Sequence, residues 1–178
     1  MGVPEGILAL LDAGPRHGYG LKLAFEAATG GGWSLNVGQV YGALQRLERD
    51  GLVAFDGEED GRKSYAMTER GRKRLEQWLL DEPVRRDGTG RDELAMKVLL
   101  SRATEAADVR RVLARQRDAT MSTLQGLTRQ KASEEHGGSL EQLVHLDRRI
   151  LHCRAELDWL DLVEQRLDDR ADDGRGSA

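Results

Sequence analysis

One stretch of the chain, SLNVGQVYGALQRLERDGLV from Ser34 to Val53, constrains the fold more than any other. Its apolar residues recur at spacings of three and four, which predicts a helix with one buried stripe. The stripe consists of Val37, Val40, Tyr41, Leu44 and Leu47. Asn36 can cap the start of this helix, and Gly51 can end it because glycine adopts a left-handed backbone without strain. We therefore expect a helix from Asn36 to Gly51 with one side packed on a core.

The opposite side of this helix carries polar groups suited to nucleic acid. Amides and guanidiniums contact base edges and phosphates in DNA complexes, and a glycine allows close approach. The residues of this stretch expected to touch DNA are Asn36, Gln39, Tyr41, Gly42, Gln45, Arg46 and Arg49. Tyr41 shares the apolar stripe, so its ring is expected to pack inward while its hydroxyl reaches a phosphate or a backbone group. An amphipathic helix with a solvated polar side is the alternative on this segment alone.

The surrounding segments favour a DNA-recognition helix. Helices are predicted over residues 4–13 and 18–28, and two strands with alternating apolar residues over 52–55 and 63–67. Thr68 is placed to cap a further helix that ends near Pro83. Helix, helix, helix, hairpin, helix is the order of a winged helix-turn-helix domain, whose third helix enters the major groove. The predicted fold class is mainly α with a small β-hairpin wing.

Charge along the predicted hairpin indicates where the DNA backbone would pass. The segment from Arg62 to Arg74 contains six basic residues and the single acid Glu69, whereas the hairpin tip from Glu58 to Asp60 is acidic. We therefore assign phosphate contacts to Arg62 and Lys63, at the base of the wing. The formal net charge of −4 does not oppose this, since DNA binding needs only a local basic patch.

The second half of the chain predicts a helical dimerisation domain. Polar residues 84–90 mark a boundary, and helices are expected over 92–101, from Thr104 to about Lys131, and from Ser139 to about Asp169. The last helix carries a heptad-like seam of Leu143, Leu146, Ile150, Cys153, Leu157 and Leu160. So much apolar surface lacks a sufficient partner within one small domain, which predicts a homodimer. The expected limits are a DNA-binding domain over 1–83, an antiparallel helical domain over 84–170 and a disordered polar tail over 171–178.

Several motifs together resemble the PadR family of bacterial transcriptional regulators. They are His17–Gly20 before the second helix, Gly38–Tyr41 and Gly51–Val53 around the third, and Tyr65–Thr68 with Gly71 after the hairpin. Residues 92–102 and 155–160 resemble the longer, virulence-regulator type of C-terminal domain. The family usually has proline after the tyrosine of the third helix, where this chain has Gly42. The resemblance implies a homodimer that binds a palindromic operator in double-stranded DNA and is often released by a small-molecule effector. Repression is the expected role, and the sequence itself leaves activation as the alternative.

Other functional classes have less support. Cys153 is the only cysteine, which excludes an intrachain disulfide and suits the reducing cytoplasm. No run of residues is apolar enough for a membrane span. His145, His152 and Cys153 lack the further ligand that a zinc site needs, and no catalytic set stands out, so neither metal, cofactor nor enzymatic activity is expected. Trp78 and Trp159 could line an effector pocket, although core packing is the ordinary role of such residues. The alternative function is a winged-helix protein-interaction module without sequence-specific DNA binding.

Overall fold

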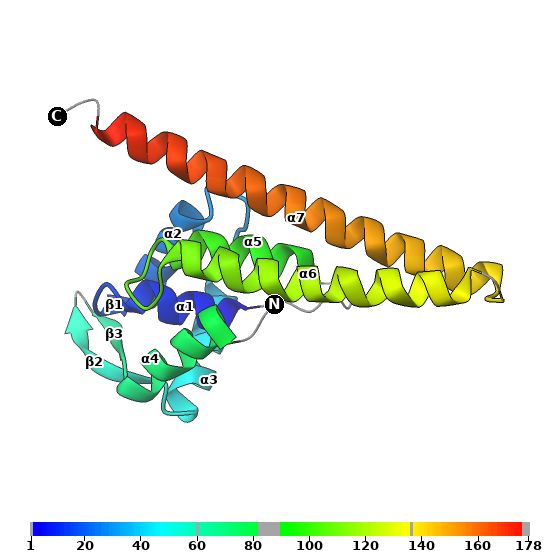
Figure 1. The fold of residues 1–178 in the computed structure, drawn as a ribbon. Coiled ribbons are helices and arrows are strands. Elements are labelled where there is room, and N and C mark those ends of the chain that lie inside the picture. Colours follow the sequence, from blue (N-terminus) through cyan, green and yellow to red (C-terminus); the bar gives the residue numbers. More distant parts are fainter. Residues whose placement is uncertain (1, 60, 82–89, 136, 176–178) are drawn as a thin grey trace. The chain divides into compact units, whose positions relative to one another are not determined.

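The computed structural model describes residues 2–59, 61–81, 90–135 and 137–175, and the chain divides into two compact units, residues 1–112 and 113–178 (Figure 1). The first unit contains the helices α1 (Val3–Leu11), α2 (Gly18–Ala28), α3 (Val37–Arg49), α4 (Glu69–Glu76), α5 (Gly90–Ser101), the π-helical turn η1 (Gln77–Asp81), and the strands β1 (Arg16–His17), β2 (Val53–Glu59) and β3 (Arg62–Met67). Helix α6 (Val109–Glu134) begins in the first unit and continues in the second, which also contains α7 (Leu140–Arg175). The predicted fold class, mainly helical with a small antiparallel sheet, is confirmed.

Helix α1 is the centre of the first unit. Pro4 lies in its first turn, where a missing backbone N–H costs nothing, and most of its side chains are buried. Ile7, Leu8 and Leu11 belong to one core with Leu21 and residues of the neighbouring helices. Helix α1 contacts α2, α3, α4, α5 and β3, so it packs against most of the helices of the unit and against the central strand of the sheet.

The sheet contains a strand that the sequence pattern does not predict. Its order is β1-β3-β2, with both pairs antiparallel, and β1 is formed only by Arg16 and His17, opposite Tyr65 and Ser64. The hairpin of β2 and β3, here called the wing, is longer than expected because β2 runs on to Glu59. A register shift between Phe55 and Gly57 marks a bulge in β2.

Helix α4 begins at the predicted cap. The Thr68 hydroxyl accepts a hydrogen bond from Gly71 N at 3.0 Å and donates to the carbonyl of Gly51 at 2.8 Å. This bond connects the start of α4 with the end of α3. The helix expected to continue to Pro83 instead ends at Glu76 and is followed by the π-helical turn η1; residues 82 and 83 lie outside the described residues.

Asp12 joins three segments of the first unit. Its side chain is only 2% exposed and lies 2.6 Å from Arg72 Nη1 of α4. It also accepts hydrogen bonds from the Thr104 hydroxyl at 2.5 Å and from Glu105 N at 3.0 Å. The expectation that Thr104 caps the long helix is therefore wrong: α6 begins at Val109, and the side chain of Asp108 accepts from Arg110 N.

In the second unit, α6 and α7 run antiparallel (Figure 1). Leu127 of α6 packs with Leu146, Ile150 and Cys153 of α7 in one apolar cluster. The pair is also linked by Arg117, which lies 2.5 Å from Asp161 Oδ1 and 2.6 Å from Glu164 Oε2. Helix α7 continues to Arg175, past the point where a disordered tail was expected, and residues 176–178 lie outside the described residues. The domain limits of 83/84 and 170/171 stay predictions.

A buried polar group lies between the two helices of the second unit. Glu156 Oε1 accepts a hydrogen bond from Gln116 Nε2 at 3.1 Å and another from the Thr120 hydroxyl. All three side chains are buried. Buried polar atoms are costly unless they find partners, so this group favours one alignment of α6 against α7.

Candidate nucleic-acid interface

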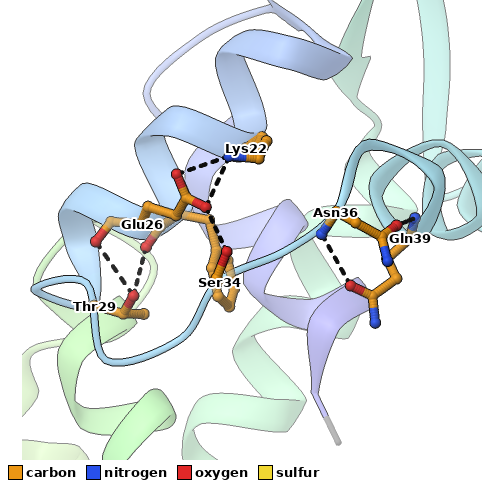
Figure 2. A network of polar contacts seen from close by, with 7 residues as sticks. Lys22, Glu26, Thr29, Ser34, Asn36 and Gln39 are labelled. Carbon is orange, nitrogen blue, oxygen red and sulfur yellow. Dashed lines mark hydrogen bonds and ion pairs between the residues drawn. The ribbon is translucent and has the colours of Figure 1, made fainter.

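A reciprocal capping box sets the first turn of α3. Gln39 N donates to Asn36 Oδ1 at 2.8 Å, and Asn36 N donates to Gln39 Oε1 at 3.0 Å (Figure 2). The predicted cap at Asn36 is therefore confirmed, and Gln39 has a structural role that the sequence analysis missed. The spacing of three residues between an Asn cap and a glutamine was the available signal. With its carbonyl oxygen so used, the Gln39 side chain presents chiefly its NH₂ group to a ligand.

The connection that leads into α3 is held by Glu26. Its carboxylate accepts from Lys22 Nζ at 2.8 Å and from the Ser34 hydroxyl at 3.0 Å (Figure 2). These hydrogen bonds, that of Lys22 first, hold the pKa of Glu26 below its ordinary value. A carboxyl group whose pKa is lowered by folding stabilises the fold at any pH above its ordinary pKa. This stabilisation is lost as the pH falls through the lowered pKa, so it is fully present at neutral pH.

The two sides of α3 differ as predicted, with a narrower buried stripe. Val40, Ala43, Leu44 and Leu47 are buried, and Gln39, Gln45, Arg46 and Arg49 are exposed. Val37 and Tyr41 were expected in the stripe but are 42% and 37% exposed. The Tyr41 ring nevertheless lies against the backbone of α2, because a Cβ built on Gly18 would be 2.7 Å from its Cζ. The structure thus brings the predicted amides and guanidiniums together on one exposed face.

Two glycines and one ion pair shape this face further. A Cβ built on Gly42 would meet nothing within 4 Å, so packing within the described residues does not require glycine there. Gly51 has φ of 70°, which favours glycine and ends α3 as predicted. Arg49 pairs with Asp50 at 3.0 Å with both side chains exposed. Such surface pairs contribute little, so Arg49 can exchange this carboxylate for a phosphate.

Arg62 and Lys63 lie at the tip of the wing, and the expectation that they lie at its base is wrong. They begin β3 directly after the turn, where the register places Lys63 opposite Glu58 and Arg62 opposite Glu59. The predicted strands were too short because the acidic residues 56–59, placed in a loop, continue β2. Both basic side chains are exposed, and the Arg62 guanidinium carbon lies 5.7 Å from the centre of the Tyr19 ring.

The other basic residues after the wing have different partners. Arg72 pairs with Asp12, and Arg74 Nη2 lies 2.8 Å from Glu5 Oε1, so both join α4 to α1. Lys73 is exposed and lies 3.9 Å from Glu69. The basic run that suggested a DNA-binding surface therefore includes two arginines that stabilise the fold.

The tryptophans proposed for an effector pocket lie in different units. Trp78 is 2% exposed, and its N–H donates to Glu93 Oε1 at 3.3 Å. Lys97 Nζ lies 5.6 Å from the centre of its ring. Trp159, on α7, is half-buried. An effector pocket at either residue stays a prediction.

The predicted dimerisation seam has partners within its own unit. Leu146, Ile150 and Cys153 pack against Leu127, with Leu124 beside them, so the argument that the seam lacks an internal partner is wrong. Leu160 is also buried, and Leu143 and Leu157 are half-buried. A second set of apolar residues on α7 is exposed, and we call it the outer face. It comprises Leu140, Val144, Leu151 and Leu162.

The described residues can also be examined for a metal site and for a membrane span. Within them, no group of three or more His, Cys, Asp and Glu side chains could hold a metal ion. Cys153 is a buried free cysteine. Among the helices that the structure describes, none is long and apolar enough to cross a membrane.

Comparison with known proteins assigns both parts of the chain. Residues 7–77 match the model of the transcriptional regulator PadR-like family, and residues 90–168 match that of the virulence activator alpha C-terminal family. The negative transcriptional regulator PadR of Bacillus subtilis is 33% identical over 129 residues, which cover 67% of this chain and 69% of that protein. The transcriptional regulator YqjI of Escherichia coli is 37% identical over 71 residues, which cover 40% of this chain and 34% of that protein.

Two solved structures match most of this chain. Bacillus subtilis PadR in complex with operator DNA is 21% identical, with a TM-score of 0.44, and the match covers 90% of this chain and 95% of that chain. The Vibrio cholerae virulence activator AphA is 25% identical, with a TM-score of 0.40, and the match covers 94% of this chain and 98% of that chain.

Proposed function

Because this chain belongs to the PadR-like family of transcriptional regulators, we propose that it is a repressor that binds a palindromic promoter site as a homodimer. The observation that supports DNA binding most is the exposed face of α3. It carries two amides and two guanidiniums on a helix whose other side is anchored in the core. An exposed helix face of this chemistry, flanked by a wing with basic residues, suits the major groove and the phosphates beside it.

The finer parts of the proposal have separate support. The PadR relative is a negative regulator by name, which supports repression. A dimer with two α3 helices would match a palindrome because each protomer contacts one half-site. We include release by a small molecule in the proposal. Trp78, which has Glu93 and Lys97 beside it, and Trp159 are the residues proposed to contact this effector.

The experiment that tests the proposal is footprinting of the purified protein on the DNA upstream of its own gene. The protected duplex and a scrambled duplex are then compared for affinity by fluorescence anisotropy. The proposal requires a protected, palindromic segment and tighter binding to it than to the scrambled duplex. Absence of binding to either duplex at low salt would favour the alternative, a winged-helix protein-interaction module.

Replacing Gln39 separates base contact from helix capping. Gln39→Glu keeps the oxygen that accepts from Asn36 N but removes the NH₂ donor, whereas Gln39→Ala removes both. We expect both variants to lose about 1 kcal/mol of discrimination between operator and scrambled duplex, a factor of about five, and only Gln39→Ala to lose thermal stability. Gln77→Ala, an exposed amide on η1, is the matched control. Equal weakening of both duplexes by Gln39→Ala would show that Gln39 does not contribute to discrimination.

Replacing Lys63 tests the phosphate contact of the wing. Lys63→Gln should weaken operator and scrambled duplex alike and reduce the slope of log affinity against log salt concentration by about 0.9. Lys73→Gln is the matched control, because Lys73 is also exposed but lies on α4 beside Glu69. A slope unchanged by Lys63→Gln, or lowered equally by Lys73→Gln, would contradict a specific role of the wing tip.

A further inference from the structure

Tyr19 and Arg62 form a cation–π pair at the edge of the candidate interface. Tyr19 is the second residue of α2, is 45% exposed, and has the Arg62 guanidinium carbon 5.7 Å from its ring centre. A guanidinium over an aromatic face is attracted by the negative charge of the π-system. Because both side chains are exposed, core packing does not explain this arrangement.

The backbone around the pair explains why the two residues meet. Strand β1 pairs with β3 so that Arg16 lies opposite Tyr65 and His17 opposite Ser64. The ladder ends at His17 and Ser64, and α2 begins at the next residue, so Tyr19 lies in the turn that directly follows β1. His17 also caps α2 by accepting a hydrogen bond from Gly20 N at 3.0 Å, so the first turn of α2 is fixed where β1 ends. The pairing of β1 with β3 and the cap at His17 therefore place the start of α2 next to the wing.

The same turn of α2 also contacts the recognition helix. The ring of Tyr41, on α3, lies against Gly18, where an added Cβ would be 2.7 Å from Cζ and 3.1 Å from the hydroxyl oxygen. Gly18 and Tyr19 are adjacent, so the start of α2 is contacted by α3 through one residue and by β3 through the next. The Tyr19–Arg62 pair thus lies beside the contact between α2 and the recognition helix.

A long, exposed arginine benefits from such a support. An unrestrained arginine side chain loses rotamer freedom when it binds a phosphate, and the facing strand offers the exposed Glu58 as a competing partner. Stacking on a ring holds the guanidinium plane while leaving its N–H groups free for hydrogen bonds. The ring therefore reduces the entropy lost on binding and favours one orientation of the fork.

We propose that Tyr19 is a positioning residue for DNA binding, whose ring holds Arg62 ready to bind a backbone phosphate. This inference rests on the proposed function, since it requires a duplex beside α3 and the wing. Tyr19 acts through its ring and through Arg62, not through its hydroxyl. Removing the ring should therefore matter only while Arg62 is present.

A double-mutant cycle tests this dependence. Operator affinity is measured for the wild type, Tyr19→Leu, Arg62→Gln, the double variant and Tyr19→Phe, with the thermal midpoint of each as a check on folding. Tyr19→Leu should weaken binding about two- to fivefold, the range expected for a cation–π contact at an exposed site. It should have no effect in the Arg62→Gln background, and Tyr19→Phe should match the wild type because it keeps the ring.

A measurement on the free protein tests the positioning role without DNA. The order parameter of the Arg62 Nε–H, measured by NMR without DNA, should indicate a restricted side chain in the wild type and in Tyr19→Phe, and a mobile one in Tyr19→Leu. A mobile Arg62 in the wild type would overturn the proposal even if Tyr19→Leu failed to fold.

The outcomes separate this inference from the proposed function. If the wild type binds operator but Tyr19→Leu weakens binding equally with and without Arg62, the positioning role is wrong and the proposed function stands. If Tyr19→Phe weakens binding as much as Tyr19→Leu, the hydroxyl is the relevant group and the proposal is again overturned. A wild type without operator binding would overturn both.

Discussion

Gly71→Ala is expected to destabilise the first unit by roughly 3 kcal/mol, because the added methyl has no space and its neighbours cannot move. A Cβ built on Gly71 would lie 2.1 Å from the carbonyl oxygen of Leu52 and 2.9 Å from Met67 Cγ. The Leu52 oxygen is backbone and is itself held, since it accepts from Thr68 N at 3.0 Å and from the Thr68 hydroxyl at 3.1 Å. Relief would require α4 to separate from the end of α3.

The measurement is chemical denaturation of the purified variant, followed by circular dichroism. Gly42→Ala is the matched control, since it makes the same change in the same unit at a helical position where a Cβ would meet nothing within 4 Å. Alanine has the higher helix propensity, so this control should gain about 0.5–1 kcal/mol. Wild-type stability in Gly71→Ala would show that the approach of α4 to Leu52 is not needed for folding.

Leu151→Asp is expected to convert the proposed homodimer into monomers and to weaken operator binding by about two orders of magnitude or more. Leu151 is 60% exposed and lies on the outer face of α7, whose residues recur at spacings of four, seven and eleven and so remain on one side of a helix. A carboxylate without a partner in an apolar interface is costly. Loss of the dimer would remove the second half-site contact. In a dimer, binding of the first half-site raises the effective concentration of the second α3 helix at the other half-site, which increases the overall affinity.

Sedimentation equilibrium at micromolar concentration gives the oligomeric state, and anisotropy with a full palindrome and a single half-site gives the affinities. Half-site affinity should be unchanged, because Leu151 is in the second unit and α3 is in the first. His145→Asp, which places the same group at an exposed position on another side of α7, is the control and should remain dimeric. A dimeric Leu151→Asp would locate the interface elsewhere, and a monomeric wild type would contradict dimerisation itself.

The outer face replaces the seam as the candidate dimer interface because α6 of the same chain covers the seam. The heptad-like spacing of Leu143 to Leu160 identified a buried stripe, but a stripe does not specify its partner. Leu124 and Leu127 of the same chain pack beside Leu146, Ile150 and Cys153. The residues still exposed are a property of the folded pair of helices, and the spacing alone could not identify them.

The sequence by itself determined the features that depend on neighbouring residues. The caps at Asn36 and Thr68, the end of α3 at Gly51, and the exposed face of α3 follow from hydrogen bonds and periodicity over one or two turns. Such interactions join residues three or four positions apart, so the spacing of residue types is sufficient to predict them.

Only the tertiary structure decided which distant residues meet. Asp12 binds Arg72, so one member of the basic run after the wing is structural, and the start of α2 places Tyr19 beside Arg62. Neither pairing has a spacing rule, because each depends on how α1, the wing and α2 pack together. The energy of a salt bridge or a stacked ring depends on distance in space, and residues far apart along the chain reach that distance only after the core has formed.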